Sequence, residues 1–309
     1  MRRALGLTGW VLRILPVVVV LLVAVPGSAV RPTSIALTTV QHAEGYDAGG
    51  DVVWVLVLGS DAPPGTSIVE GDTDAIQLLG IDAGTGAAAA IGIPRDTYVD
   101  LGGEKGRINV ALRTAKGDPA LVAGAVADLV GISPDFVLVT GGQGFEAMID
   151  TLGGVTVDSP VAFDTDDGGM HVVKGPNHFD GEQALDFATT RRAFAGPGDF
   201  VRSANHQALL LGLLNQLQAR DDREGFVEAM ALASLDGIDT DASPLDLYRL
   251  LNALTAVDPD QAKGCILVGE ESQDPVGNFV VLPDSVLGHQ LGEDAVDDAT
   301  FDQGCEGSP

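Results

Sequence analysis

Three apolar runs of strand length follow one another in the first third of the chain, at Val52–Leu58, Ala75–Ile81 and Ala87–Ile93. Continuous apolar runs of this length, bounded by turn residues, are typical of strands buried on both faces. Asp82-Ala83-Gly84-Thr85-Gly86 joins the second run to the third as a hairpin-type turn. Because a sheet buried on both faces needs helices over each face, these runs limit the chain to a layered α/β architecture.

Helices are expected after these strands. Asp118-Pro119, followed by an apolar pattern that stops at Gly131, has the start and stop signals of a helix. Further helices are expected at Gly144–Leu152, Gly181–Arg191, Phe200–Ala219 and Leu245–Thr255, and further strands at Phe136–Val139, Val155–Val157, Ile266–Val268 and Phe279–Leu282. This order predicts an α/β/α sandwich, in which a central mixed β-sheet is covered by helices on both faces.

Residues 1–34 are expected to form a membrane anchor or a signal segment. Three arginines precede the apolar run Ile14–Val25, and Pro26-Gly27-Ser28-Ala29 follows it. The run is short for a membrane span of ~20 residues, and the small residues after it suit a cleavage site. Both alternatives therefore stay open: a single-pass membrane protein with an extracytoplasmic domain, or a secreted protein if the leader is cleaved. In either case the arginines place the start of the chain in the cytoplasm.

The rest of the chain divides into a linker at residues 35–50, a core domain at 51–235 and a segment at 236–309 that completes the domain. The linker is expected because its residues are polar and weakly patterned. Cys265 and Cys305 are the only cysteines. Because an exported chain can oxidise them, we expect a Cys265–Cys305 disulfide. A metal pair or a reactive thiol is the weaker alternative, since no histidine cluster accompanies them.

The chain is strongly acidic, with 44 Asp plus Glu against 17 Lys plus Arg and a formal net charge of -27. This charge excludes nucleic acid as an expected partner, because phosphate backbones require a basic face. Against such a background, a cation at a strand end indicates that an anion binds there. Arg95 is in that position, because it follows the third apolar run and Pro94, and ligands often bind at strand ends in layered sheets.

Five arginines form the candidate basic site, and the pair Asp61 and Asp74 forms a candidate metal site. The arginines are Arg95, Arg107, Arg191, Arg192 and Arg202. Each alone also fits a surface salt bridge, but together in an acidic chain they indicate a phosphate clamp. Asp61 and Asp74 lie at the edges of neighbouring strands, where two carboxylates suit Mg²⁺ or Mn²⁺ with phosphate oxygens as further ligands. Ordinary turn aspartates are the alternative.

Leucines crowd the helix expected at Phe200–Ala219, at positions 209, 210, 211, 213, 214 and 217. A face this wide predicts near-complete burial in the core. The alternative is that the same side chains line a lipid groove.

Many of these motifs occur together in one known family, and the chain resembles it from about Val53 to Leu217. The matching stretches are Leu56–Asp61, Thr73-Asp74, Ile81-Asp82, Ile91–Thr97, Arg107-Ile108-Asn109, Gly131-Ile132, Gly144-Phe145, Leu152–Val155, Asp180–Leu185, Arg191 and Gly198–Phe200 with Arg202. Their order and spacing resemble those of the LytR-CpsA-Psr family of exported wall-polymer ligases.

The resemblance implies an α/β/α sandwich with an apolar pocket for a polyprenyl chain. It also implies a phosphotransferase that attaches a glycopolymer from a polyprenyl-pyrophosphate carrier to peptidoglycan. On this basis Asp61 and Asp74 would hold the metal, and Arg95, Arg191 and Arg202 would bind the pyrophosphate. Asp96 would orient Arg95, or less preferably accept a proton. Such catalysis consists mainly of positioning and charge neutralisation.

The chain departs from the family pattern at four places. Ala62-Pro63-Pro64 stands where the family has an arginine after the first aspartate, and Asp72 stands where it has one before the second. Thr189 replaces the first of two paired arginines, and Asn205 and His206 replace an Arg-Gln pair among the substrate-binding positions. Because each lost charge-assisted hydrogen bond weakens binding by ~1.5–3 kcal/mol, a second hypothesis stands beside the enzyme: a weak or inactive module that binds polyprenyl phosphates.

Overall fold

The computed structural model describes residues 35–39, 52–166, 168–191, 198–220, 238–240, 246, 250, 253–302 and 304–305. They belong to one compact unit that spans residues 33–309. The segment predicted at residues 1–34 and the candidate residue Arg192 lie outside the described residues, as does most of the helix predicted at Leu245–Thr255. Within the described ranges, no helix is both long and apolar enough to cross a membrane.

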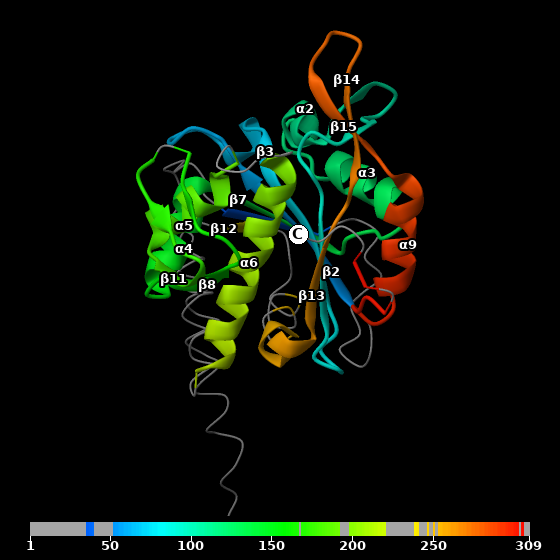
Figure 1. The fold of residues 1–309 in the computed structure, drawn as a ribbon. Coiled ribbons are helices and arrows are strands. Elements are labelled where there is room, and N and C mark those ends of the chain that lie inside the picture. The colour runs from blue at the N-terminus through cyan, green and yellow to red at the C-terminus, as the bar shows by residue number, and fades with distance from the viewer. Residues whose placement is uncertain are drawn as a thin grey trace, which may run out of the picture. The chain divides into compact units, whose positions relative to one another are not determined.

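Seven of the described strands form a mixed sheet at the centre of the unit (Figure 1). Its strands lie in the order β12 (Ile238–Thr240), β1 (Ile35–Thr39), β7 (Phe136–Gly141), β2 (Val53–Ser60), β3 (Thr73–Ile81), β4 (Ala88–Gly92) and β13 (Ala262–Ile266). β2 pairs parallel with β7 and antiparallel with β3, and β4 pairs antiparallel with β3 and parallel with β13. The three apolar runs of the sequence thus form the adjacent strands β2, β3 and β4.

Helices cover both faces of this sheet. α3 (Ala120–Val130) and α9 (Ser285–Ala295) lie on one face, and α4 (Gly142–Thr151), α5 (Gly181–Thr189) and α6 (Gly198–Gln218) lie on the other (Figure 1). The predicted α/β/α sandwich with a mixed sheet is therefore confirmed.

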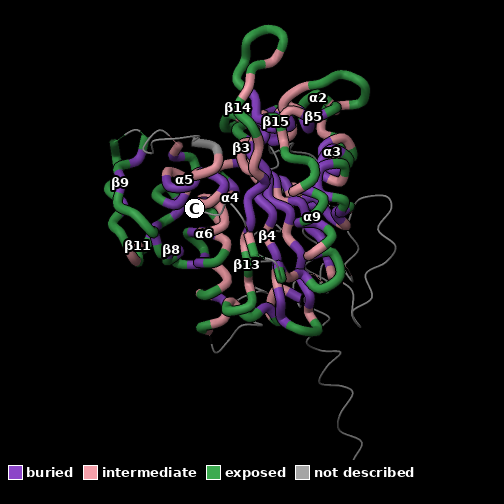
Figure 2. The backbone as a smooth tube through the Cα atoms, turned by 45° about the vertical axis from the view of Figure 1, so that its right-hand side comes forward, coloured by how far each residue is buried: buried purple, intermediate pink, exposed green. Residues whose placement is uncertain are grey.

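The main core lies between the sheet and α3 and α9. Alternate residues of β2, including Leu56 and Leu58, pack there against Val126 of α3 and Leu291 of α9. This alternation follows from the two-residue period of a strand. Figure 2 shows the sheet strands largely buried.

Shorter elements join or extend these layers. They are α2 (Ala111–Thr114), the single-turn 3₁₀ helices η1 (Ile68–Glu70), η2 (Ile108–Val110) and η3 (Pro259–Gln261), and four two-stranded pairs: β5 (Tyr98–Asp100) with β6 (Lys105–Arg107), β8 (Val155–Ser159) with β11 (Gly175–Phe179), β9 (Phe163–Asp164) with β10 (His171–Val172), and β14 (Gly269–Gln273) with β15 (Phe279–Pro283). The tip of the β14–β15 hairpin is exposed (Figure 2).

Three differences from the sequence expectations bear most on the fold and the site. The sequence predicts a linker at residues 35–50, but Ile35–Thr39 forms β1 and pairs antiparallel with β7. It predicts the last strand before the hairpin at Ile266–Val268, but β13 covers Ala262–Ile266 because it pairs there with β4. α5 ends at Thr189, so Arg191 lies two residues beyond the helix rather than at its end. Each difference arises from pairing or capping that local sequence patterns do not encode.

The C-terminal part of the chain is tied to the sheet. Cys265 of β13 and Cys305 form a disulfide, with their Cα atoms 5.4 Å apart. β13 pairs with β4 directly before Arg95, and Cys265 lies opposite Ile91. The crosslink therefore joins the tail of the chain to the strand beside the candidate site.

Candidate active site

Asp61 and Asp74 lie together where β2 ends and β3 begins. The two strands are antiparallel, and two hydrogen bonds lock the connection: Asp61 N donates to Asp72 O at 3.0 Å, and Asp72 N donates to Asp61 Oδ1 at 2.7 Å. Burial raises the pKa of Asp61, and the nearby Asp74 and Asp72 carboxylates raise it further, while the Asp72 N–H and Arg95 act in the opposite direction. The carboxylate of Asp61 thus lies beside two others, and this favours a cation close to it.

A β-bulge directs Asp74 into the site. Gly59 pairs with Ala75, whereas Ser60 pairs with Thr73, so Asp74 is the extra residue of β3. A bulge breaks the alternation of a strand and re-aims the side chain at that point. The side chain of Asp74 consequently contacts Arg202 of α6. Simple alternation along β3 would instead direct it to the face of the sheet opposite Gln77.

Two arginines contact the Asp74 carboxylate. Arg95, which follows β4 and Pro94, forms an ion pair with Oδ1, and Arg202 of α6 places Nη1 3.5 Å from Oδ2. The side chains of Arg95 and Arg202 are 17% and 4% exposed. Because two shielded cations share one carboxylate, this part of the site carries an excess of positive charge, which suits an anionic ligand.

Asp96 lies behind Arg95 and joins it to a third arginine. Its Oδ1 is 3.7 Å from Arg95 Nε and 3.2 Å from Arg107 Nη1. The Asp96 side chain is 10% exposed, so its carboxylate has little contact with solvent. This position suits a residue that orients two guanidinium groups.

Asn109 is a residue of this site that the sequence reasoning did not single out. Its backbone N–H donates to Arg95 O at 3.1 Å, and its carbonyl accepts from Thr73 Oγ1 at 3.2 Å. Asn109 is fully buried, and its side-chain amide has no hydrogen-bond partner within the described part of the chain. Its motif, Arg107-Ile108-Asn109, was the available signal. The backbone of Asn109 thus links Arg95 to Thr73, the residue directly before Asp74.

The remaining predicted residues lie at the junction of α5 and α6. Arg191 N donates to Asp166 Oδ2 at 3.2 Å, and its side chain forms no ion pair with another described residue. Asn205 Nδ2 donates to Phe187 O at 3.0 Å, and His206 Nε2 lies 3.0 Å from Ala188 O. In this structure the polar ends of Asn205 and His206 are therefore directed to the last turn of α5.

His206 is neutral in this environment. Burial, together with the neighbouring positive charge of Arg202, lowers its pKa from 6.5 to about 3. Because a carbonyl only accepts hydrogen bonds, Nε2 carries the proton and Nδ1 is a bare acceptor. Nδ1 has no hydrogen-bond partner within the described ranges.

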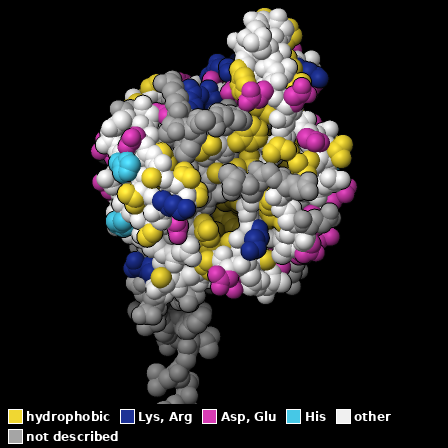
Figure 3. All heavy atoms as spheres, viewed as in Figure 1, with side chains coloured by type: hydrophobic (Ala, Val, Ile, Leu, Met, Phe, Trp, Pro, Cys, Tyr) yellow, Lys and Arg dark blue, Asp and Glu magenta, His cyan; other side chains and the backbone are white. Residues whose placement is uncertain are grey.

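An apolar surface extends from the charged cluster along α6. Leu209 and Leu217 are buried, but Leu210, Leu213 and Leu214 are only half-buried and Leu211 is 41% exposed. The predicted near-complete burial of this helix is therefore wrong. On the facing strands the side chains at Val57, Leu79 and Leu138 are also half-buried, although these strands are central in the sheet. Figure 3 shows apolar side chains lining a hollow beside α6.

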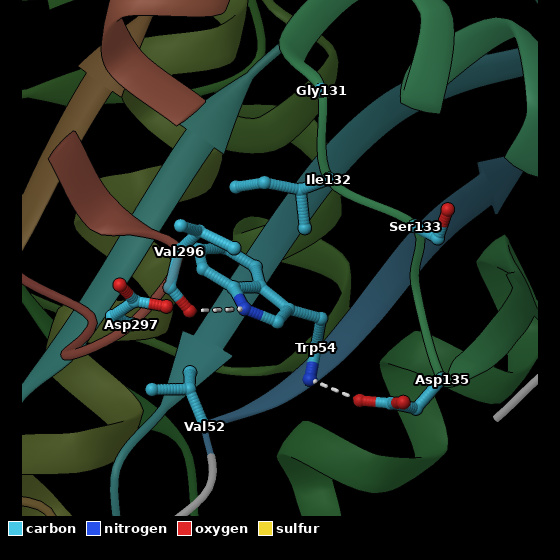
Figure 4. A pocket seen from close by; sticks show the side chains of 8 residues that line it. All are labelled: Val52, Trp54, Gly131, Ile132, Ser133, Asp135, Val296 and Asp297. Carbon is cyan, nitrogen blue, oxygen red and sulfur yellow. Dashed lines mark hydrogen bonds between the residues drawn. The ribbon is translucent and has the colours of Figure 1, made fainter. Parts of the chain in front are cut away.

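A separate cavity of about 260 Å³ lies at the opposite end of β2. Trp54 lines it, and the ring nitrogen of Trp54 donates to Val296 O at 3.3 Å while its backbone N donates to Asp135 Oδ2 at 2.8 Å (Figure 4). No Lys or Arg of the described residues lines this cavity. It therefore does not suit a phosphate, and the arginine cluster is the candidate site.

The comparison with known proteins agrees with this geometry. The sequence model of the LytR_cpsA_psr family matches residues 31–281. The chain belongs to the LytR-CpsA-Psr family.

Named relatives of this LytR-CpsA-Psr protein are transferases. A polyisoprenyl-teichoic acid–peptidoglycan teichoic acid transferase TagU from Oceanobacillus iheyensis is 32% identical over 171 residues, which are 54% of this chain and 52% of the relative. The TagU of Bacillus subtilis is 29% identical over 163 residues, which are 52% of this chain and 51% of that protein. The chain thus spans about half the length of the curated relatives it matches.

Solved structures show the same fold. The crystal structure of B. subtilis TagV has a TM-score of 0.66 at 23% identity and covers 81% of this chain and 98% of its own. A structure of TagT bound to LI-WTA has a TM-score of 0.64 at 21% identity, and covers 87% of this chain and 97% of its own.

One of the residues that depart from the family pattern forms an ion pair. Asp72, which stands where the family has an arginine, pairs with Arg113 of α2 through an Nε–Oδ1 distance of 2.7 Å. The arginine at this edge therefore comes from α2 and is paired with Asp72. Thr189, the substitute for the first paired arginine, donates its hydroxyl to Leu185 O within α5 at 2.9 Å, so it places no cation in the site.

Proposed function

We propose that this chain transfers a phosphate-linked glycopolymer from a polyprenyl-pyrophosphate carrier to a peptidoglycan hydroxyl outside the membrane. The observation that carries the proposal is the Arg95–Asp74–Arg202 cluster at the edge of the sheet, next to the apolar surface of α6. A polyprenyl pyrophosphate needs both features, because its head is anionic and its tail is apolar. The relatives named as teichoic acid transferases support the same substrate class.

In this reaction the acceptor hydroxyl oxygen forms a bond to the phosphorus that bears the glycan. The bond from that phosphorus to the bridging oxygen breaks, polyprenyl monophosphate leaves with that oxygen, and the hydroxyl proton passes to the leaving phosphate or to water. Arg95 and Arg202 would bind the pyrophosphate oxygens and neutralise the charge that develops on the leaving group. Asp96 would keep the Arg95 and Arg107 guanidinium groups oriented, which lowers the reorganisation needed during the reaction.

The carboxylates fit a hard divalent cation when phosphate oxygens complete its coordination. Among the described residues, no three His, Cys, Asp or Glu side chains gather into a site that would hold a metal alone. Mg²⁺ commonly binds through one or two carboxylates plus substrate phosphates, and Asp61 and Asp74 would supply these carboxylates. When bound, the ion would neutralise pyrophosphate charge and polarise its oxygens.

We also propose that residues 1–34 anchor the chain in the membrane or direct its export. Three arginines before the apolar run support a cytoplasmic start and an extracytoplasmic catalytic unit. This placement would bring the apolar surface of α6 to the compartment in which lipid-linked wall precursors are used.

Turnover by the full-length protein in detergent tests the function. With a polyprenyl-pyrophosphate-linked glycan, Mg²⁺ and peptidoglycan fragments, mass spectrometry should detect polyprenyl monophosphate and glycan-modified peptidoglycan. Arg95→Ala should lower the rate by roughly 10²–10³-fold, the usual effect of losing one preorganised charge-stabilising group. Lys174→Ala, which removes an exposed cation between β10 and β11, is the charge-matched control and should retain the parent rate.

Two other results would contradict the proposal. If the parent retains bound lipid phosphate but never releases monophosphate, the chain is a binding module. If neither binding nor turnover occurs, both hypotheses fail.

A further inference from the structure

Two glutamines, the buried Gln77 and the half-buried Gln207, connect α6 to the sheet just beyond Arg202. Gln77, in the middle of β3, is 1% exposed, and its Nε2 donates to Ser203 O of α6 at 3.4 Å. Gln207 of α6 places its Nε2 3.2 Å from Gln77 Oε1. The same nitrogen lies 2.8 Å from Cys265 O and 3.4 Å from Ala90 O. One carboxamide thus contacts β3, β4 and β13.

The sheet is shaped to receive this pair. A Cβ atom at Gly92 of β4 would lie 3.1 Å from both Gln77 Nε2 and Gln207 Nε2. A Cβ atom at Gly264 of β13 would overlap Gln207 Oε1. Because Gly92 and Gly264 have no side chains, the backbones of β4 and β13 lie directly against the two carboxamides. This lets α6 lie close to these strands.

The residues around the two glutamines show where this contact lies along α6. On β3, the neighbours of Gln77 on the same face are Ala75 and Leu79, and on α6 the half-buried Leu210, Leu213 and Leu214 of the apolar surface follow Gln207. A hydrogen-bonded polar pair at the contact between a helix and a sheet favours one packing arrangement over others. This pair therefore fixes the rotation and the height of α6 at the border between the charged cluster and the apolar surface.

We propose that Gln77 and Gln207 are positioning residues that hold the first turns of α6 so that Arg202 meets Asp74. Gln77 bonds the carbonyl of Ser203, the residue directly after Arg202, and Arg202 Nη1 lies 3.5 Å from Asp74 Oδ2. The proposal rests on the proposed function, because it assigns the pair to the binding of the pyrophosphate head. The glutamines act through Arg202 and do not contact the lipid.

Replacement of both glutamines by methionine tests this role. The bond between the two glutamines loses both partners to apolar groups of similar shape, which has little effect on folding, so Q77M/Q207M should keep the fold while removing the fixed position. Its affinity for geranylgeranyl pyrophosphate, measured by calorimetry, should fall about tenfold, and its affinity for geranylgeraniol should stay unchanged. A tenfold loss corresponds to about 1.4 kcal/mol.

Gln216→Met is the matched control. Gln216 is on the same helix and also bonds a backbone carbonyl, that of Leu152 at 3.0 Å, but it lies about 21 Å along the helix from Arg202 at 1.5 Å per residue. It should bind both ligands as the parent does. An equal loss of affinity for both ligands in Q77M/Q207M, or no loss for either, overturns the proposal.

A ligand-free measurement separates this proposal from the proposed function. The Arg202 side chain is 4% exposed, so its N–H signals should be protected from exchange in a ¹⁵N-arginine NMR spectrum and identified by their loss in Arg202→Lys. The Arg202 N–H signals should persist in Gln216→Met. In Q77M/Q207M they should be lost, because the exposed guanidinium then exchanges its protons rapidly with water. A parent that binds neither ligand contradicts the proposed function, whereas retained Arg202 signals in the double variant contradict the positioning role.

If Q77M/Q207M does not fold, Gly92→Ala gives the same test. Its Cβ would crowd both amide nitrogens at 3.1 Å and displace the pair without removing it. It should weaken pyrophosphate binding selectively and shift the Arg202 signals, and unchanged affinity with unchanged signals overturns the proposal.

Discussion

His206 joins the two helices that border the site, and it does so as a neutral side chain. Its Nε2–H bonds Ala188 O, while Arg202 lies one turn earlier on the same helix and opposes protonation. In the folded state the pKa is about 3, against 6.5 for an unperturbed histidine. The unfolded chain therefore binds a proton between these pH values that the folded chain does not.

This difference predicts a pH-dependent stability. The contribution of His206 is complete above pH 6.5 and is lost as the pH falls toward 3, because protonation then favours the unfolded state. Relative to His206→Gln, the unfolding free energy of the parent should fall by about 1.4 kcal/mol per pH unit between about pH 6 and 4. Urea unfolding at several pH values measures this slope. His289→Gln, at an exposed position of α9, should keep the parent slope, and equal slopes for the parent and His206→Gln would contradict the assignment.

At the residue scale, the sequence predicts which residues form the site better than it predicts which of them contact each other. Arg95, Asp96 and Arg107 follow a strand end and a short hairpin, so their proximity follows from local chain geometry. The meeting of Asp74 with Arg202 does not, because it depends on a bulge at Asp74 that strand alternation hides. The engagement of Asn205 with α5 was equally hidden, since it is a contact between two helices.

At the scale of elements, α9 packs on α3 by direct backbone approach. A Cβ atom at Gly288 would overlap Leu129 O, and one at Gly292 would overlap Val130 O. Both carbonyls belong to the last turn of α3. The two glycines therefore allow α9 to approach the end of α3, which places Leu291 in the main core.

Gly292→Ala should consequently destabilise the protein. The added methyl group cannot be accommodated without moving a helix, and overpacking of this kind costs about 1–3 kcal/mol. Gly124→Ala on α3 is the matched control, because the position that its added methyl group would take is open among the described residues and alanine favours a helix interior by roughly 0.5–1 kcal/mol over glycine. Thermal unfolding should show a lower melting temperature for the first variant and an equal or higher one for the second. A Gly292→Ala protein as stable as the parent would show that α9 does not make this contact.

The same glycines explain why α9 was absent from the sequence expectations. Ser285–Ala295 has a capping Asp284, whose carboxylate accepts from Val286 N and Leu287 N, but two interior glycines lower helix propensity. β1 was missed because Ile35–Thr39 has no pattern of its own and is defined by pairing with β7. By contrast, β2, β3 and β4 carry long apolar runs, and α3 carries clear end signals, so local sequence sufficed.

At the scale of the whole molecule, charge opposes the ligand that the site suits. The chain has a formal net charge of -27, and pyrophosphate is itself anionic. Three arginines of the cluster, Arg95, Arg107 and Arg202, are accompanied by Asp74 and Asp96, so much of their charge is already neutralised. Binding of a pyrophosphate beside Asp61 should therefore leave an excess of negative charge, which a divalent cation would offset.

Affinity for an isoprenyl pyrophosphate should accordingly depend on Mg²⁺. At equal ionic strength, calorimetry should find geranylgeranyl pyrophosphate bound at least about tenfold more tightly with Mg²⁺ than with a chelator, a difference of about 1.4 kcal/mol. Geranylgeraniol should bind equally in both conditions, because only the charged head interacts with the cation. Asp61→Asn should reduce the Mg²⁺ increment without weakening binding of the alcohol. If the pyrophosphate binds equally well with the chelator, the arginines alone neutralise it, and the carboxylates of Asp61 and Asp74 serve to orient these cations rather than to hold a metal.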